Sequence, residues 1–168
     1  GYSDVLVGAP NYDSPAQGGE QPNLGRAYAF YGSPGALGAG AAGLVAAAFA
    51  ARAGVPTLLI EKGRQTGVKI RIAGGGHCNL THDCSVRAML AGFGPAASFL
   101  EPTMKAFSPR AVRRYFDAIG VPTYIGEHEK VWPVSRSARQ VRDALEIDAR
   151  AAGAEIRLLC PAVAVERC

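Results

Sequence analysis

Gly38-Ala39-Gly40-Ala41-Ala42-Gly43 is the stretch that decides the fold of this chain, because its three glycines stand at the spacing G-x-G-x-x-G. A helix-forming run follows from Leu44 to Ala53, and Gly54 ends it. The next residues, 55–60 (VPTLLI), predict a buried strand that Glu61 closes. Turn, helix, strand and acid thus follow one another in the order of a dinucleotide-binding unit.

Each part of this stretch has a physical role in binding a dinucleotide. Gly38 allows a tight turn, Gly40 lets the backbone approach a pyrophosphate, and Gly43 lets the helix pack closely on the sheet. The helix N-terminus offers unpaired N–H groups and the positive end of its dipole to phosphates. Glu61 can accept hydrogen bonds from ribose hydroxyls. An Ala-rich core helix after a glycine loop is the alternative, because the motif is short and the chain is rich in both residues.

One part of the fingerprint is missing, because a hydrophobic first strand normally leads directly into the glycine turn. Here residues 31–37 (YGSPGAL) predict a turn instead. Residues 26–31 (RAYAFY) are the nearest run that favours a strand, and the hypothesis is that they occupy the missing slot beside residues 58–60. The detour at 32–37 argues against it.

Composition narrows the function classes. A hydrophobic content of 48% is that of a globular protein, and the net charge of +4 is spread at helical spacings rather than in one patch. We therefore expect no nucleic-acid partner. The run 36–51 is too short and too rich in Ala and Gly to span a bilayer, so no membrane partner is expected. Four cysteines without a C-x-x-C pair indicate reduced thiols and a cytoplasmic protein. Because the chain begins at Gly1 without an initiator Met, we expect a fragment or a junction product.

Residues 1–35 differ in character from the rest. Their matching stretches, Gly1–Pro10 and Gly25–Gly32, resemble an FG-GAP repeat, one blade of an integrin-type β-propeller. In that family an acidic loop just before this point binds calcium. Here only its tail with Asp4 remains, which cannot supply the six to eight oxygens that calcium takes. Because a single repeat cannot bury its own hydrophobic face, we expect no blade function. An ordinary β-hairpin with a long loop is the alternative.

A second glycine-rich stretch follows the fingerprint, at Gly67–Thr81 (GVKIRIAGGGHCNLT). Three consecutive glycines predict a loop whose exposed N–H groups can wrap an anionic or flat ligand. Asn79 and Thr81 add hydrogen-bonding side chains, and Lys69 adds a charge suited to a phosphate. Adjacent His77 and Cys78 cannot readily point at one ion, so no metal is predicted, even with His82, Asp83 and Cys84 nearby.

The fingerprint, the strand end Glu61-Lys62-Gly63 and the loop Gly74–Thr81 together resemble a family of bacterial flavoproteins, the aminoacetone-oxidase-like FAD-binding, NAD(P)/FAD-dependent oxidoreductases. The resemblance covers 37–168, the N-terminal part of that domain, and the family usually has Arg where this chain has His77. It implies an FAD cofactor, with NAD(P)H as a candidate electron donor. The cofactor-binding residues that follow from the fingerprint, the loop and the resemblance are Gly38, Gly40, Ala42, Gly43, Glu61, Lys62, Lys69, Gly74, Gly75, Gly76, Cys78, Asn79, Thr81 and Val163.

The rest of the chain predicts regular elements. The predicted helices are 93–107, 108–119 and 137–152. Ser108 is the predicted N-cap of the second helix, and the third helix has an amphipathic pattern. The predicted strands are 154–159 and 162–166, and a β-hairpin is predicted over 121–132. Trp132-Pro133 is interpreted as core packing, and His128 as a solvated loop residue. No side chain stands out as a general acid or base, so no catalytic residue is predicted.

The predicted fold class is α/β: a partial FAD/NAD(P)-binding Rossmann-like domain at 36–168, behind a short β-hairpin, propeller-blade-like segment at 1–35. The predicted function is that of an FAD-dependent oxidoreductase acting on a small-molecule substrate, as a fragment that binds the ADP part of FAD. Two alternatives are kept: a non-enzymatic FG-GAP adhesion protein and an inactive fusion fragment. Substrate, electron acceptor and oligomeric state are not predicted.

Overall fold

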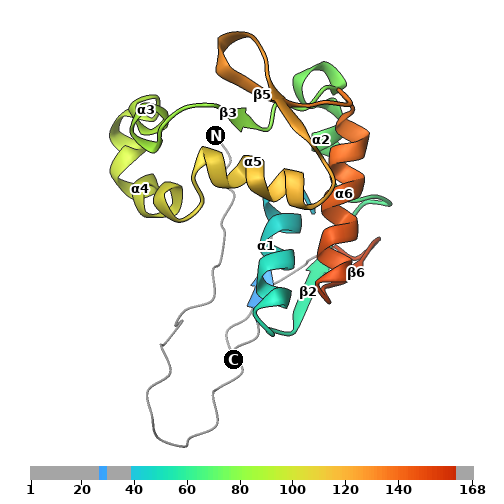
Figure 1. The fold of residues 1–168 in the computed structure, drawn as a ribbon. Helices are drawn as coiled ribbons and strands as arrows, with labels where there is room; N and C mark the ends of the chain where they lie inside the picture. The colour runs from blue at the N-terminus through green and yellow to red at the C-terminus, as the bar shows by residue number, and fades with distance from the viewer. Residues whose placement is uncertain (1–26, 30–38, 162–168) are drawn as a thin grey trace, which may run out of the picture. The chain divides into compact units, whose positions relative to one another are not determined.

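The computed structural model of this chain describes residues 27–29 and 39–161 (Figure 1). These residues form two compact units. The first unit contains the described residues up to 68 together with 145–161, and the second contains 69–144. The stretch Gly1–Pro10 and the predicted strand at 162–166 lie outside the described residues, and the domain boundary at residue 35 stays a prediction.

A parallel three-stranded sheet is the centre of the first unit. Its strands are β1 (Ala27–Ala29), β2 (Thr57–Ile60) and β6 (Glu155–Arg157), in the order β1-β2-β6. Leu58 is the Cα partner of Tyr28 on one side and of Glu155 on the other. The hypothesis that the run 26–31 lies beside 58–60 is therefore confirmed for its described residues, 27–29, which pair with 57–59. A run from the N-terminal 35 residues thus contributes a strand to the parallel sheet.

Helix α1 (Ala41–Arg52) runs alongside β2 and connects β1 to it (Figure 1). Its buried residues are Gly43, Leu44, Ala47 and Ala48, which form one stripe at helical spacing. Because Gly43 has no side chain, the helix can approach the sheet closely, as the fingerprint predicts. The helix begins three residues earlier than predicted, and Gly54, with a φ of +78°, follows its end.

The C-terminal part of helix α6 (Ala138–Ala151) contacts other elements of the first unit through two polar interactions. Asp148 forms an ion pair with Arg52 of α1. The hydroxyl of Thr66, which is completely buried, donates to the carboxylate of Glu146 over 2.6 Å. Together with buried Leu145 and Ala149, these contacts make α6 part of the core, in agreement with the amphipathic pattern of 137–152.

The second unit contains an antiparallel sheet with the order β3-β5-β4. Strands β4 (Thr123–Ile125) and β5 (Lys130–Pro133) form the predicted hairpin, and β3 (Thr81–His82) pairs with the other side of β5. A short 3₁₀ turn at Glu127–Glu129 connects the two hairpin strands.

Three helices accompany this sheet: α3 (Val86–Ala91), α4 (Ala97–Ala106) and α5 (Pro109–Ala118). The Ser108 hydroxyl accepts a hydrogen bond from the N–H of Ala111, so the predicted cap of α5 is confirmed. The predicted helix at 93–107 is shorter than expected, because a 3₁₀ turn at Gly94–Ala96 precedes α4. Helix α3 was not predicted, although Ser85 caps it in the same way.

The stretch 67–81, predicted as a loop, is partly helical. Helix α2 (Val68–Ile72) and a 3₁₀ turn (Ala73–Gly76) occupy its first half. The prediction was wrong for α2 because the glycines that follow it favour a loop. In the structure, Ile70 is buried and anchors this short helix. Within the described ranges, none of the helices has the length and apolar character needed to cross a membrane.

Candidate functional site

The glycine turn at the start of α1 is held in place by hydrogen bonds from the backbone groups of Ala39. Gly38 lies outside the described residues. Ala39 is completely buried, its N–H donates to the Glu61 carboxylate over 2.6 Å, and its carbonyl accepts the N–H of Gly67 over 2.6 Å. Gly40 is the N-cap of α1 and offers no capping side chain. The turn is thus fixed while the first N–H groups of the helix keep no side-chain partner.

The N-terminus of α1 suits an anion. Its first turn consists of Ala41, Ala42 and Gly43 and contains no acidic residue. The first N–H groups of an α-helix have no intrahelical acceptor, and the helix dipole places partial positive charge there. Since Ala41 and Ala42 are exposed and small, a phosphate can reach these donors.

Glu61 lies at the mouth of this turn although its side chain is buried, with 6% of the residue exposed. One carboxylate oxygen accepts the N–H of Ala39, and the other accepts the N–H of Gly63 over 2.7 Å. The backbone of Glu61 is bonded to Arg157 and Cys160. Each carboxylate oxygen can accept about two hydrogen bonds, so the bonds to Ala39 and Gly63 use about half of the carboxylate's acceptor positions. The sequence predicted the ribose contact but not the bond to Ala39.

The structure brings Gly40, Gly43 and Glu61 together in the first unit. Lys62 follows Glu61 and is exposed. Val163 lies outside the described residues. The other predicted residues, from Lys69 to Thr81, belong to the second unit and form a separate group.

In the second unit, three consecutive glycines have left-handed backbone conformations, with φ between +55° and +88° at Gly74, Gly75 and Gly76. A Cβ on Gly74 would lie 3.0 Å from the ring of Trp132, so glycine is required there for space as well as for conformation. The side-chain oxygen of Asn79 is buried and has no hydrogen-bond partner among the described residues. Thr81 lies in β3, and Lys69 is exposed on α2.

Two thiols in this unit are protonated at neutral pH. Burial raises the pKa of Cys78, and burial followed by the negative charges of Glu129 and Asp83 raises the pKa of Cys84. Cys78 is a small buried side chain with a φ of +60°. Among the described residues, no three His, Cys, Asp or Glu side chains are grouped closely enough to hold a metal ion.

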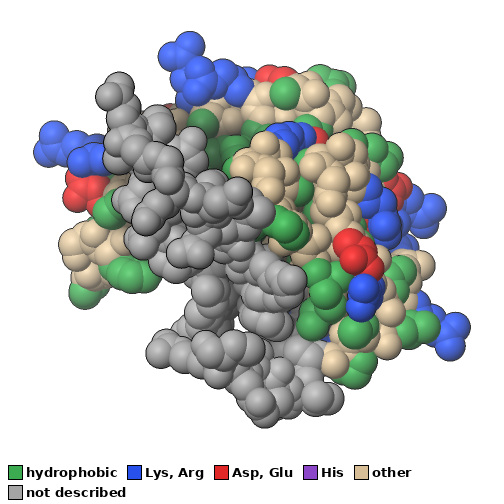
Figure 2. All heavy atoms as spheres, turned by 90° about the horizontal axis from the view of Figure 1, so that it is seen from below, with side chains coloured by type: hydrophobic (Ala, Val, Ile, Leu, Met, Phe, Trp, Pro, Cys, Tyr) green, Lys and Arg blue, Asp and Glu red, His purple; other side chains and the backbone are tan. Residues whose placement is uncertain are grey.

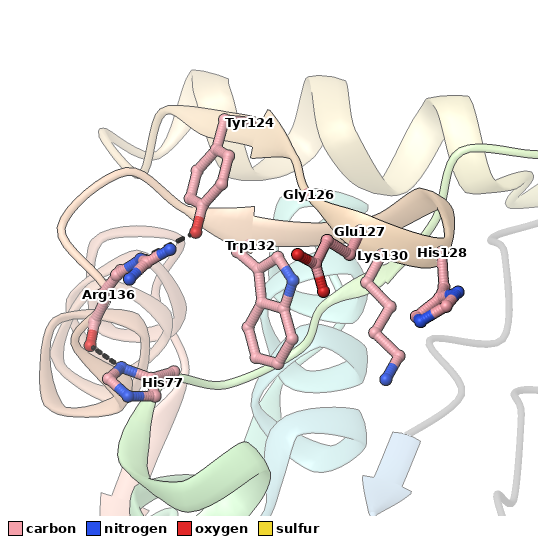
Figure 3. A pocket seen from close by; sticks show the side chains of 8 residues that line it. All are labelled: His77, Tyr124, Gly126, Glu127, His128, Lys130, Trp132 and Arg136. Atoms are coloured by element: carbon pink, nitrogen blue, oxygen red, sulfur yellow. Dashed lines mark hydrogen bonds between the residues drawn. The ribbon is translucent and has the colours of Figure 1, made fainter.

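The second unit also contains a pocket that the sequence did not reveal (Figure 3). Its volume is about 420 Å³. The lining residues are His77, Tyr124, Gly126, Glu127, His128, Lys130, Trp132 and Arg136. His128, predicted to be only solvated, and Trp132, interpreted as core, both line it. The alternation of residues along the hairpin could have indicated this shared face.

A second cavity of about 790 Å³ lies between β3 and the helices α3, α4 and α5. Apolar side chains dominate its lining, among them Met89, Phe93, Met104 and Phe107. Thr81, at the end of the glycine-rich stretch, also contributes to it.

Comparison with known proteins places these features in context. The ribosomal RNA dihydrouridine synthase of Escherichia coli (strain K12) is 50% identical over 46 residues, which are 27% of this chain and 12% of that protein. The 3-dehydro-bile acid delta(4,6)-reductase of Clostridium scindens (strain ATCC 35704 / DSM 5676 / VPI 13733 / 19) is 30% identical over 118 residues, or 69% of this chain and 28% of that protein. The chain therefore spans less than a third of either relative.

Among solved structures, the crystal structure of Thermovibrio ammonificans THI4 aligns with a TM-score of 0.49 and 16% identity, over 72% of this chain and 36% of that one.

A family model, the HI0933-like protein Rossmann domain, matches residues 36–167 and so includes the glycine turn, α1, β2 and Glu61. Together with the reductase relative, this match supports FAD as the cofactor. Because the match covers most of the sequence, the chain belongs to the HI0933-like protein Rossmann domain family.

Proposed function

We propose that this chain is the part of an FAD-dependent oxidoreductase that binds the ADP portion of FAD. The observation that carries the proposal is the hydrogen bond of 2.6 Å between buried Glu61 and Ala39, which places a carboxylate at the open N-terminus of α1. One anion-binding and one hydroxyl-binding group thus lie at the same turn, as a diphosphate joined to a ribose requires. FAD, when bound, supplies the redox chemistry.

The residues of the first unit have distinct roles in this proposal. The N–H groups at Gly40–Gly43 bind the diphosphate, and the exposed methyl groups of Ala41 and Ala42 leave room for it. Glu61 accepts hydrogen bonds from the ribose hydroxyls with the acceptor positions that Ala39 and Gly63 leave open. Lys62, exposed beside it, is suited to contact the adenosine half.

The more specific assignment, to the aminoacetone-oxidase-like flavoproteins with NAD(P)H as electron donor, is also a proposal. It is supported by the order of the fingerprint and the later loop Gly74–Thr81 along the chain. In this assignment the loop, with Cys78, Asn79 and Thr81, contacts the flavin, and Val163 contacts the adenine. The FG-GAP resemblance of residues 1–35 rests on the sequence alone.

Substrate class and location are proposals too. We favour a small molecule, because the match to the bile acid reductase extends over 118 residues, whereas the match to the ribosomal RNA enzyme extends over 46. On the face drawn in Figure 2, Lys and Arg side chains stand in several separate places rather than in one patch. Such a distribution does not favour a nucleic-acid surface. A cytoplasmic location remains an expectation from the cysteines.

Titration with FAD tests the proposal directly, with fluorescence polarisation of the flavin as the readout. We expect weak, saturable binding, because the chain spans only part of its relatives. ADP should compete with FAD, whereas riboflavin should not, since the contacts proposed for this unit are to the ADP half. The variant Glu61→Ala should raise the Kd about tenfold or more, because it removes a charged acceptor from a buried site.

The control is Glu101→Ala, which removes a carboxylate from a surface ion pair with Lys105 on α4. It should leave the Kd unchanged. Circular dichroism shows whether each variant remains folded. Competition by riboflavin but not by ADP, or an unchanged Kd in folded Glu61→Ala, would contradict the assignment.

A further inference from the structure

The pocket of the second unit is built on one face of the β4–β5 hairpin (Figure 3). Tyr124 and Trp132 are Cα partners across the two strands, and Lys130 lies two residues before Trp132 on the same face. Successive side chains of a strand point to opposite faces. The opposite face carries Val131 and Pro133, which are buried and supply the packing. The pocket face is therefore not needed as core.

Two glycines leave the space that the indole of Trp132 occupies in this pocket. A Cβ on Gly74 would lie 3.0 Å from its benzo ring, and a Cβ on Gly126 would lie 3.0 Å from Cδ1 and 3.1 Å from Nε1. Gly126 has a φ of −99°, which any residue can adopt, so its lack of a side chain matters for the indole rather than for the backbone. Within the described part of the chain, the indole N–H meets no protein acceptor.

Cationic groups stand on both sides of this ring in Figure 3. Arg136 is oriented by Tyr124. The Nε of Arg136 donates to the phenol oxygen over 2.8 Å, and its guanidinium carbon lies 5.7 Å from the centroid of the Tyr124 ring. Neither Arg136 nor Lys130 forms an ion pair with any carboxylate of the described residues. Glu127 is the acidic side chain in the lining. The terminal nitrogens of Arg136 are thus available to an anion.

His77 adds a directional group at the same wall. Its Nδ1 lies 3.0 Å from the backbone carbonyl of Arg136. A carbonyl can only accept, so Nδ1 carries the proton and Nε2 of the neutral ring is an acceptor. His77 is exposed, and Figure 3 shows its ring at the edge of the pocket below Arg136. A ligand hydroxyl or N–H can therefore be recognised beside the anionic group.

We infer that this pocket binds a small planar carboxylate, with its ring against Trp132 and its carboxylate on the cation Arg136. A volume of about 420 Å³ is at the small end of ligand sites, which suits one or two rings. An aromatic lining favours a flat ligand, and two unpaired cations against one acid favour an anion. The inference uses residues of the second unit only and does not rest on FAD binding.

Three matched probes test it: benzoate, which is planar and anionic; benzamide, which is planar and neutral; and cyclohexanecarboxylate, which is anionic and not planar. Trp132 is the single tryptophan of the chain, so its fluorescence reports directly from the pocket. We expect saturable quenching by benzoate that weakens as salt is added. The two other probes should bind at least about fivefold more weakly, since each lacks one of the two interactions.

Variants locate the site. Arg136→Gln should raise the benzoate Kd about fivefold, and Lys105→Gln, on the surface of α4, should leave it unchanged. The probe series on the unaltered chain decides the matter if a variant does not fold. Equal binding of benzoate and benzamide, equal binding of benzoate and cyclohexanecarboxylate, or the absence of saturable quenching would each overturn the inference.

Discussion

Glu61 shows how one side chain can serve both a fold and a ligand. Its carboxylate bonds to Ala39 in the glycine turn and to Gly63 after β2, so it connects the two ends of the α1–β2 segment. Hydrogen bonds from backbone N–H groups to a carboxylate are stronger than neutral ones. The turn is consequently arranged before a ligand arrives, and little ordering of this residue has to accompany binding.

Gly126 is the residue whose replacement tests the packing of the pocket. In Gly126→Ala the new methyl group would lie 3.0 Å from Cδ1 of Trp132, which is too close for two carbon atoms. The indole must move or the strand must shift, at a cost of about 1–3 kcal/mol in the free energy of unfolding. We expect a shifted Trp emission maximum together with a lower urea midpoint.

Gly92→Ala is the matched control for that prediction. Gly92 follows α3 with a φ of −74°, and its nearest neighbour, the carbonyl oxygen of Met89, would be 3.4 Å from a Cβ. Emission and midpoint should both stay unchanged. If Gly126→Ala behaved in the same way, the indole would not be held as described.

At the level of elements, the sequence predicted best those features that depend on a few neighbouring residues. The cap at Ser108 and the hairpin between β4 and β5 were predicted, because capping and turn formation depend on neighbours in sequence. Helix α2 was missed, because its five residues precede a glycine run and carry one buried side chain, Ile70. Short helices gain most of their stability from packing rather than from propensity.

The cap of α5 leads to a prediction for the element. Ser108→Ala removes the acceptor of the Ala111 N–H and should lower the free energy of unfolding by about 1 kcal/mol. Urea denaturation followed by circular dichroism measures the change. Ser98→Ala, at an exposed position inside α4, is the control and should be neutral or slightly stabilising, since alanine favours helices. Equal effects of the two substitutions would argue against a capping role.

On the scale of the whole molecule, the sheet of the first unit includes β1, a strand that lies outside the residues that the family model matches. Ala27–Ala29 pairs with β2 and gives this sheet its third strand. Without it, the N–H and C=O groups on one side of β2 would lose their partners, and β2 would become an edge strand.

Truncation tests this dependence. A chain that starts at residue 36 lacks β1 and should be less stable and more prone to aggregate than the full chain, because an unpaired hydrophobic edge invites association. A chain that starts at residue 25 keeps β1 and is the control. Urea midpoints and light scattering compare the two. Equal midpoints and equal scattering would show that β1 contributes nothing to the sheet.

The sequence alone determined the glycine turn, α1, β2 and the acid that follows, because glycine spacing, helix period and strand composition are properties of neighbouring residues. It also indicated the partner of β2, which the structure places at residues 27–29. The tertiary structure alone decided that Glu61 bonds to Ala39, and that His77 joins Arg136 beside Trp132. These contacts connect residues 22 and 59 positions apart. Such distances are set by how elements pack in space, which no local period encodes.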